Sequence, residues 1–187
     1  MQEIWCISGP CGSGKTTLSA ALAQELSRQQ GGRQVCLLHG DDFHAALIGD
    51  ECSPAALPWP QVLRFNWACL ISAAGHALDC GLDVVIDYII EDELPLLRHL
   101  AREHGARLRY AVLTAPEDVL RQRLQLRGDP HLTDRALFLR QKLLTIPENQ
   151  GRVLDGTLAQ PELLRSLRAL PELLHCDIDT TAADGVS

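Results

Sequence analysis

Residues 9–16 read Gly9-Pro10-Cys11-Gly12-Ser13-Gly14-Lys15-Thr16 and match G-x-x-x-x-G-K-[ST] at every fixed position. Glycines at these positions allow a tight turn whose backbone N–H groups point inward at phosphate oxygens. A helix is expected to begin near Gly14 and to add its positive end to the same site. An apolar run precedes the loop and an amphipathic stretch follows it, which is the context the motif requires. The sequence therefore predicts a loop that binds the phosphates of ATP, with GTP as the alternative.

Each side chain of the loop has an expected part in nucleotide binding. Lys15 reaches the β- and γ-phosphates, and the hydroxyl of Thr16 ligates Mg²⁺. Thr17 adds a second phosphate contact, whereas Cys11 occupies a variable position of the loop and has no role of its own. The nucleotide-binding residues predicted from the sequence are Gly9, Cys11, Gly12, Ser13, Gly14, Lys15, Thr16 and Thr17.

Apolar runs and amphipathic stretches alternate along the rest of the chain. This order predicts βαβ units and an α/β, three-layer sandwich around a five-stranded parallel sheet, as in P-loop NTPases. One domain is expected over 1–176, with a lid near 127–135 and a flexible tail over 177–187. The predicted strands are 4–8, 34–39, 83–88, 107–114 and 151–155, and the predicted helices are 14–30 (ended by Gly31-Gly32), 61–79, 91–104, 117–126, 133–144 and 161–174. Residues 40–60 are expected to be irregular.

The composition narrows the class of protein. The net charge of −7 disfavours a nucleic-acid or anionic-lipid surface, and no apolar run is long enough to cross a bilayer. The N-terminus lacks the basic region of a secretory signal. The sequence has seven cysteines, an odd number, and no C-x-x-C motif, which argues against a disulfide framework and a structural zinc site. Buried, reduced thiols in a cytoplasmic protein are therefore expected.

Two acids follow the second predicted strand, in the run His39-Gly40-Asp41-Asp42-Phe43-His44. Ligands of a parallel sheet gather at the carboxyl ends of its strands, so a carboxylate there can accept a proton from an attacking hydroxyl. We expect Asp41 to be the base and hold Asp42 as the alternate. The competing interpretation is a solvated acidic turn that caps the next segment.

The run Val84-Val85-Ile86-Asp87 has the form of a Walker B element. Its carboxylate is expected beside Thr16, where it holds a water molecule of the Mg²⁺ ion. Glu91, Asp92 and Glu93 form a rival acidic cluster, which is more typical of the start of a helix.

Basic residues concentrate after the fourth predicted strand, at Arg121, Arg123, Arg127 and Arg135. Phosphoryl transfer needs cations near the moving group, and a mobile lid can supply them while excluding water. We expect Arg127, then Arg123, to act in this way. The competing interpretation is an ordinary basic surface.

Further upstream, Arg64 is expected to contact the substrate. The aromatic residues around it, Trp59, Phe65 and Trp67, are candidates for an apolar acceptor pocket or for plain core.

Taken together, these motifs resemble the small P-loop kinases, which include gluconate, shikimate and nucleoside kinases and chloramphenicol phosphotransferases. The run at 39–44 is similar to the Asp-Gly-Asp-Asp-Leu-His stretch of gluconate kinases and to the Gln-Asp-Asp-Phe stretch of nicotinamide riboside kinases. Residues 58–66 and 118–124 resemble tunicamycin-resistance ATP-binding proteins. The resemblance implies strand order 2-3-1-4-5 and an Asp, here Asp41, that binds the acceptor hydroxyl or acts as base. The lid departs from the gluconate and adenylate kinase patterns, so the acceptor does not carry over.

The sequence thus predicts a Mg²⁺-dependent kinase that moves the γ-phosphoryl group of ATP to a hydroxyl of a metabolite, nucleoside or antibiotic. Lys15, Asp41, Arg127 and Arg123 are the expected catalytic residues. Two alternatives stay open: a nucleoside-triphosphate hydrolase or switch, and a non-enzymatic protein that binds an antibiotic or metabolite. The expected partner is a small molecule, with no nucleic acid or membrane, and the chain is a monomer or homodimer.

Overall fold

A five-stranded, fully parallel sheet forms the centre of the protein. The computed structural model describes residues 1–28, 34–47 and 57–173. The strands run in the order β2-β3-β1-β4-β5, which confirms the predicted topology. They are β1 (Glu3–Ser8), β2 (Val35–His39), β3 (Asp83–Asp87), β4 (Arg107–Thr114) and β5 (Val153–Asp155).

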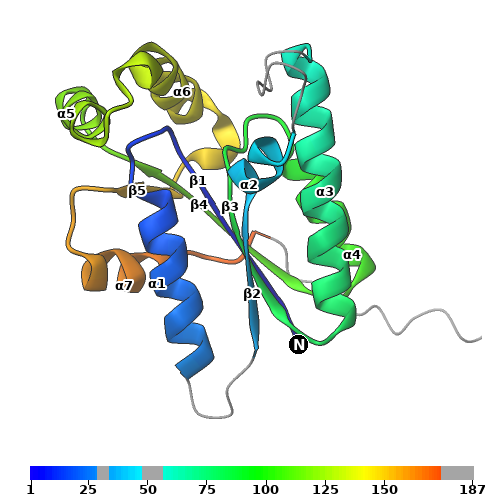
Figure 1. Cartoon of the computed structure of the whole chain (residues 1–187). Helices are drawn as coiled ribbons and strands as arrows, with labels where there is room; N and C mark the ends of the chain where they lie inside the picture. The colour runs from blue at the N-terminus through cyan, green and yellow to red at the C-terminus, as the bar shows by residue number, and fades with distance from the viewer. Residues whose placement is uncertain (29–33, 48–56, 174–187) are drawn as a thin grey trace, which may run out of the picture.

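Helices cover both faces of this sheet (Figure 1). One face carries α1 (Lys15–Arg28) and α7 (Gln160–Ala169), and the other carries α3 (Trp59–Asp79) and α4 (Leu94–Glu103). The remaining helical segments lie towards the carboxyl ends of the strands: α2 (Gly40–Ala45), α5 (Glu117–Arg127), η2 (Pro130–Leu132), α6 (Thr133–Thr145) and η3 (Pro147–Asn149). This arrangement is the predicted three-layer sandwich.

The alternation of side chains along β1 divides the core into two parts. Ile4 and Cys6 pack with the cluster under α3 and α4, whereas Trp5 and Ile7 pack with the cluster under α1 and α7. Successive side chains of a strand point to opposite faces, so a continuous apolar run such as residues 4–7 is what a strand buried on both sides requires. The first strand is thereby fixed at the middle of the sheet, with the phosphate loop directly after it.

The prediction that residues 40–60 are irregular is wrong at both ends of that segment. Gly40–Ala45 form α2, where Asp41 and Asp42 lie in the first turn and interact favourably with the positive end of the helix. At the other end, α3 begins at Trp59 because Pro60 fits the first turn, where its missing N–H has no helical partner to lose.

Proline also explains two other shifts of helix boundaries. Pro95 occupies the first turn of α4, which begins at Leu94 rather than near residue 91. Pro171 disfavours helical dihedrals at Leu170, so α7 ends at Ala169 rather than at residue 174. The predicted end of the first helix at Gly31-Gly32 and the predicted flexible tail over 177–187 lie outside the described residues.

The expectation of buried thiols holds for one of the five cysteines that the structure describes and is wrong for the other four. Cys6 is buried, and this burial raises the pKa of its thiol far above the ordinary range. Cys80 is exposed, and Cys11, Cys36 and Cys69 are partly exposed. Cys52 and Cys176 lie outside the described residues. Within the described part of the chain, no helix is long and apolar enough to cross a membrane.

Candidate active site

The phosphate loop lies between β1 and α1 and has the backbone conformation that its glycines permit. Gly14 has a φ of 98°, a left-handed value that side chains disfavour. A Cβ atom on Gly9 would overlap the backbone carbonyl of Leu113 in the neighbouring strand β4. The hydroxyl oxygen of Ser13 is buried without a hydrogen-bond partner among the described residues, and Lys15 Nζ donates only one long bond, 3.4 Å, to the Pro10 carbonyl. These donors fit the phosphates of a nucleotide.

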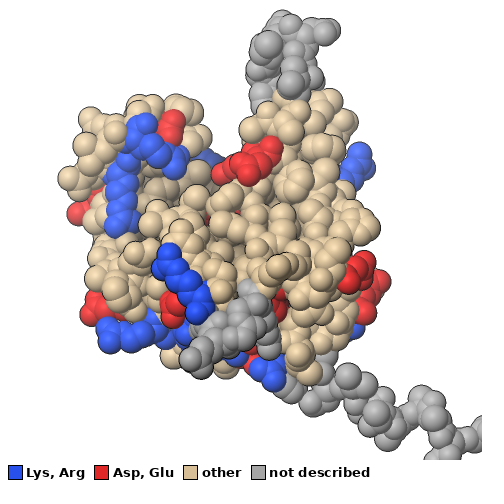
Figure 2. Space-filling model, turned by 60° about the horizontal axis from the view of Figure 1, so that its bottom comes forward, with Lys and Arg blue, Asp and Glu red and all other residues tan. Residues whose placement is uncertain are grey.

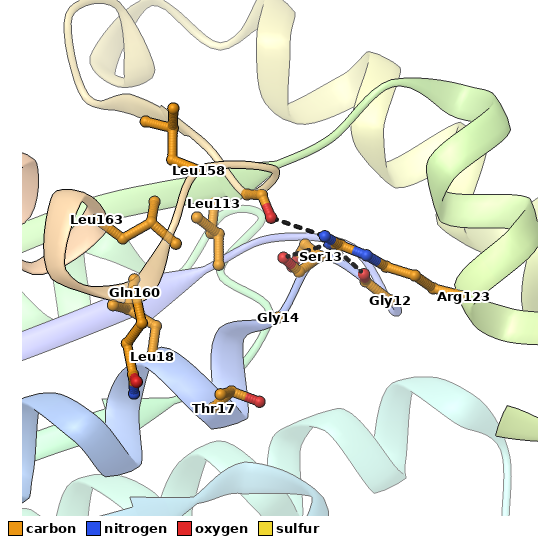
Figure 3. Close-up of a pocket in the computed structure, with 11 residues that line it drawn as sticks. Gly12, Ser13, Gly14, Thr17, Leu18, Leu113, Arg123, Leu158, Gln160 and Leu163 are labelled. Carbon is orange, nitrogen blue, oxygen red and sulfur yellow. Dashed lines mark hydrogen bonds between the residues drawn. The ribbon is translucent and has the colours of Figure 1, made fainter. Parts of the chain in front are cut away.

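An apolar cavity of about 300 Å³ opens on one side of this loop (Figure 3). Its walls include Leu18 of α1, Leu113 of β4, and Leu158 and Leu163 from the segment that follows β5, with the Gln160 amide as a polar group. Planar apolar ligands bind in cavities of this kind, where a few polar groups fix their orientation. The position beside the phosphate loop suits the nucleoside part of the nucleotide.

Arg123 joins the phosphate loop to the segment after β5. Its guanidinium donates to the carbonyls of Gly12 (3.2 Å), Ser13 (3.3 Å) and Gly156 (2.9 Å), as Figure 3 shows. Gly156 is required there, because a Cβ would lie only 2.5 Å from the Ser13 carbonyl oxygen. The adjoining turn is held by Asp155, whose pKa is lowered by hydrogen bonds from the Thr157 N–H and then its hydroxyl.

A second cavity, of about 240 Å³, surrounds the expected position of the phosphates. It brings together residues from three distant segments of the chain, in each of which the sequence predicted functional residues. Its lining consists of Cys11, Gly12, Gly14, Lys15, Thr16, Thr17, Asp41, Arg123 and Arg127. The parallel sheet causes this convergence, because the carboxyl ends of β1, β2 and β4 meet at one edge.

A third cavity, of about 320 Å³, adjoins the second. The two share three lining residues, Cys11, Asp41 and Arg127. The third cavity extends from there to Trp59 at the start of α3 and to Tyr88 after β3. Asp41, an exposed residue of α2, therefore stands where the phosphate cavity meets a second, partly open space of ligand size.

Three other predicted residues have different surroundings. Asp42 is exposed on α2, and Arg64 lines another cavity, of about 500 Å³ between α3 and α4, which shares Leu63 and Glu93 with the third cavity. Asp87 is buried at the end of β3, and its Oδ2 lies 3.0 Å from Nδ1 of His39. Two assignments remain predictions: that Asp42 and Arg64 contact the substrate, and that Asp87 and Thr16 form the magnesium site.

Sequence reasoning gave no role to Tyr88. Burial raises the pKa of its phenol, and Asn66 Nδ2 donates a hydrogen bond of 2.9 Å to the Tyr88 oxygen. The Tyr88 ring packs directly on Gly40, where a Cβ would overlap it. The available signal was position, since Tyr88 follows Asp87 at a strand end where ligands gather.

Comparison with known proteins shows that the chain shares its fold with solved structures described as kinases and as a tunicamycin resistance protein. The tunicamycin resistance protein of Deinococcus radiodurans superposes with a TM-score of 0.61 at 20% identity, over 92% of this chain and 98% of that one. A sugar kinase from Janibacter sp. HTCC2649 gives 0.57 at 20% identity (88% and 91%), and a gluconokinase from Sinorhizobium meliloti 1021 gives 0.51 at 21% (89% of each).

The chain belongs to the AAA domain family, whose model matches residues 4–146. No curated protein matches the chain in sequence. At about one-fifth identity the structural likenesses establish the fold, and they confirm the resemblance to small P-loop kinases and tunicamycin-resistance proteins at that level.

Proposed function

We propose that this protein is a Mg²⁺-dependent kinase that transfers the γ-phosphoryl group of ATP to a hydroxyl of a small molecule. The observation that carries the proposal is the position of Asp41, which lines both the phosphate cavity and the adjoining third cavity. A carboxylate at that junction is within reach of a hydroxyl that enters from one side and of a phosphate that lies on the other.

The residues around the junction have complementary parts in this reaction. Asp41 takes the proton of the acceptor hydroxyl while the oxygen of that hydroxyl forms a bond to the γ-phosphorus. The bond between the γ-phosphorus and the β–γ bridging oxygen breaks at the same time, and ADP leaves. Lys15 holds the β- and γ-phosphates, and Arg127 stabilises charge on the moving phosphoryl group. Thr16, with Asp87 through water, would hold a magnesium ion, which neutralises charge on the phosphates.

The volume of the third cavity and the distribution of charged side chains on one face of the protein support a small acceptor. The cavity of about 320 Å³ lies at the lower end of the usual range of ligand sites, roughly 300–1,000 Å³. On the face in Figure 2, the Lys and Arg side chains lie in separate groups among Asp and Glu, rather than in the continuous band typical of a nucleic-acid surface.

The test is ATP turnover with Mg²⁺, first without acceptor and then with a panel of alcohols, sugars and nucleosides. Asp41→Asn should reduce transfer by about 10²-fold or more, while the Kd for ATP changes little, because the amide cannot accept the proton. Fast turnover without any acceptor would favour a hydrolase. Unchanged transfer by Asp41→Asn would refute the assignment of the base.

A further inference from the structure

The cavity next to the phosphates has walls that are mainly apolar and aromatic. Trp59 lies at its rim with 48% of its surface exposed, and its ring meets the His44 ring edge-on at a centroid distance of 5.5 Å. Tyr88 forms a buried part of the wall, fixed by the Asn66 hydrogen bond and by contact with Gly40. Such surfaces bind ring faces and apolar edges rather than a chain of hydroxyl groups.

The two arginines of this cavity are already neutralised by partners in the protein. Arg135 forms an ion pair with Glu91, a residue that also binds Lys142 at 3.0 Å. Arg127 pairs with Asp129 at 2.6 Å. An anionic acceptor would have to compete with Glu91 or Asp129 for one of these cations, which lowers the gain from binding an anion.

The acids of the cavity differ in their partners. Glu91 has the two cationic partners already described, whereas Asp41 and Glu93 have no ion pair among the described residues. Glu93 accepts the backbone N–H groups of Glu91 (2.9 Å) and Asp92 (3.0 Å), both through Oε2. The cavity therefore keeps two carboxylates that no cation of the protein neutralises, and this disfavours an anionic acceptor.

We infer that the acceptor is a small alcohol that carries an apolar ring and no negative charge, with the ring against Trp59 and Tyr88 and the hydroxyl at Asp41. This inference rests on the proposed kinase activity and narrows its substrate class. It separates this chain from kinases of sugar acids and nucleotides, whose acceptors are anions.

The experiment measures binding by calorimetry to the full chain loaded with Mg²⁺ and a non-hydrolysable ATP analogue. The probes are 1-phenylethane-1,2-diol, mandelate, in which a carboxylate replaces the CH₂OH of the diol, and gluconate, which has no ring. The diol should have a Kd about tenfold lower than each of the other two, since one disrupted half-buried ion pair or lost ring contact is worth that factor or more.

Two variants make the assignment specific. Trp59→Ala should raise the Kd for the diol about tenfold, whereas Phe65→Ala, an exposed aromatic of the same helix outside the cavity lining, should not change it. Glu91→Gln removes the acid that neutralises Arg135 and Lys142, and should therefore lower the Kd for mandelate about fivefold or more.

Equal or tighter binding of mandelate or gluconate would overturn the inferred class, as would a Trp59→Ala variant that binds the diol like the wild type. A parallel assay with γ-labelled ATP distinguishes this failure from failure of the proposed function. Labelled phosphogluconate without labelled diol would sustain the kinase and overturn the ring-bearing class. Selective binding of the diol, with no label transferred to any alcohol, would overturn the kinase and sustain the ligand class.

Discussion

Arg123 offers the sharpest test of how the phosphate loop is held. Replacing it with alanine removes one hydrogen bond of 2.9 Å and two longer ones, of 3.2 and 3.3 Å, all from a charged donor to backbone carbonyls. Bonds to charged groups contribute about 1.5–3 kcal/mol, and the longer pair less. Because Arg123 is only partly buried and water can replace it, we expect a loss of about 2–3 kcal/mol in the free energy of unfolding.

For a domain of this size that loss lowers Tm by roughly 5–10 °C. It should also raise the Kd for ATP about tenfold, because the carbonyls of Gly12 and Ser13 are no longer fixed. Scanning calorimetry and nucleotide titration measure both quantities. Arg123→Lys should restore little, since one ammonium cannot span three carbonyls. Arg121→Ala is the matched control on the exposed side of α5.

The opposite pattern would refute this reasoning. If Arg123 instead contacts the transferring phosphoryl group, as the sequence alone indicated, its alanine variant would keep the wild-type Tm and Kd for ATP. Its kcat would then fall about 10²-fold or more.

Further predictions concern the same edge of the sheet. Gly156→Ala places a Cβ 2.5 Å from the Ser13 carbonyl oxygen and should lower the free energy of unfolding by about 1–3 kcal/mol, measured by urea titration. Lys15→Met should raise the Kd for ATP tenfold or more at unchanged Tm, because one charge-assisted phosphate contact is lost. The pKa of Asp155 is lower in the folded protein than in the unfolded chain, where an Asp titrates near pH of about 4. Ionised Asp155 therefore stabilises the folded protein above about pH 4, and this contribution is lost as the pH falls further. Asp155→Ala should remove that acid-dependent part of a Tm-against-pH profile.

Each of these predictions has an outcome that contradicts it. Wild-type stability of Gly156→Ala would mean that the loop after β5 can move away from the phosphate loop. Wild-type affinity of Lys15→Met would place the phosphates elsewhere. If wild type and Asp155→Ala have parallel profiles between pH 5 and about 2.5, Asp155 is not the group that titrates.

Local signals were sufficient for the sheet and the phosphate loop. The run at residues 4–7 is apolar at successive positions, as a strand buried on both faces requires, and the glycines after it permit the tight turn of the phosphate loop. Asp41 was also within reach of sequence reasoning, because a parallel sheet brings every loop that follows a strand to one edge. The predicted helix boundaries near Pro60 and Pro171 differ from those in the structure. A proline fits the first turn of a helix, as in α3, whereas a proline that follows a helix disfavours helical dihedrals at the residue before it, as in α7.

The tertiary structure alone decided which side chains face one another around the loop. Arg123 and Arg127 are four residues apart on one helix and look equivalent in sequence, yet Arg123 binds backbone carbonyls while Arg127 lines the junction of two cavities. Gly156 and Tyr88 matter because of atoms that lie far from them in the chain, the Ser13 carbonyl and the Gly40 backbone. The amino-acid sequence determined the layers and the phosphate loop through local geometry. The lining and charge balance of the acceptor cavity depend on contacts between distant segments, which only the packed structure specifies.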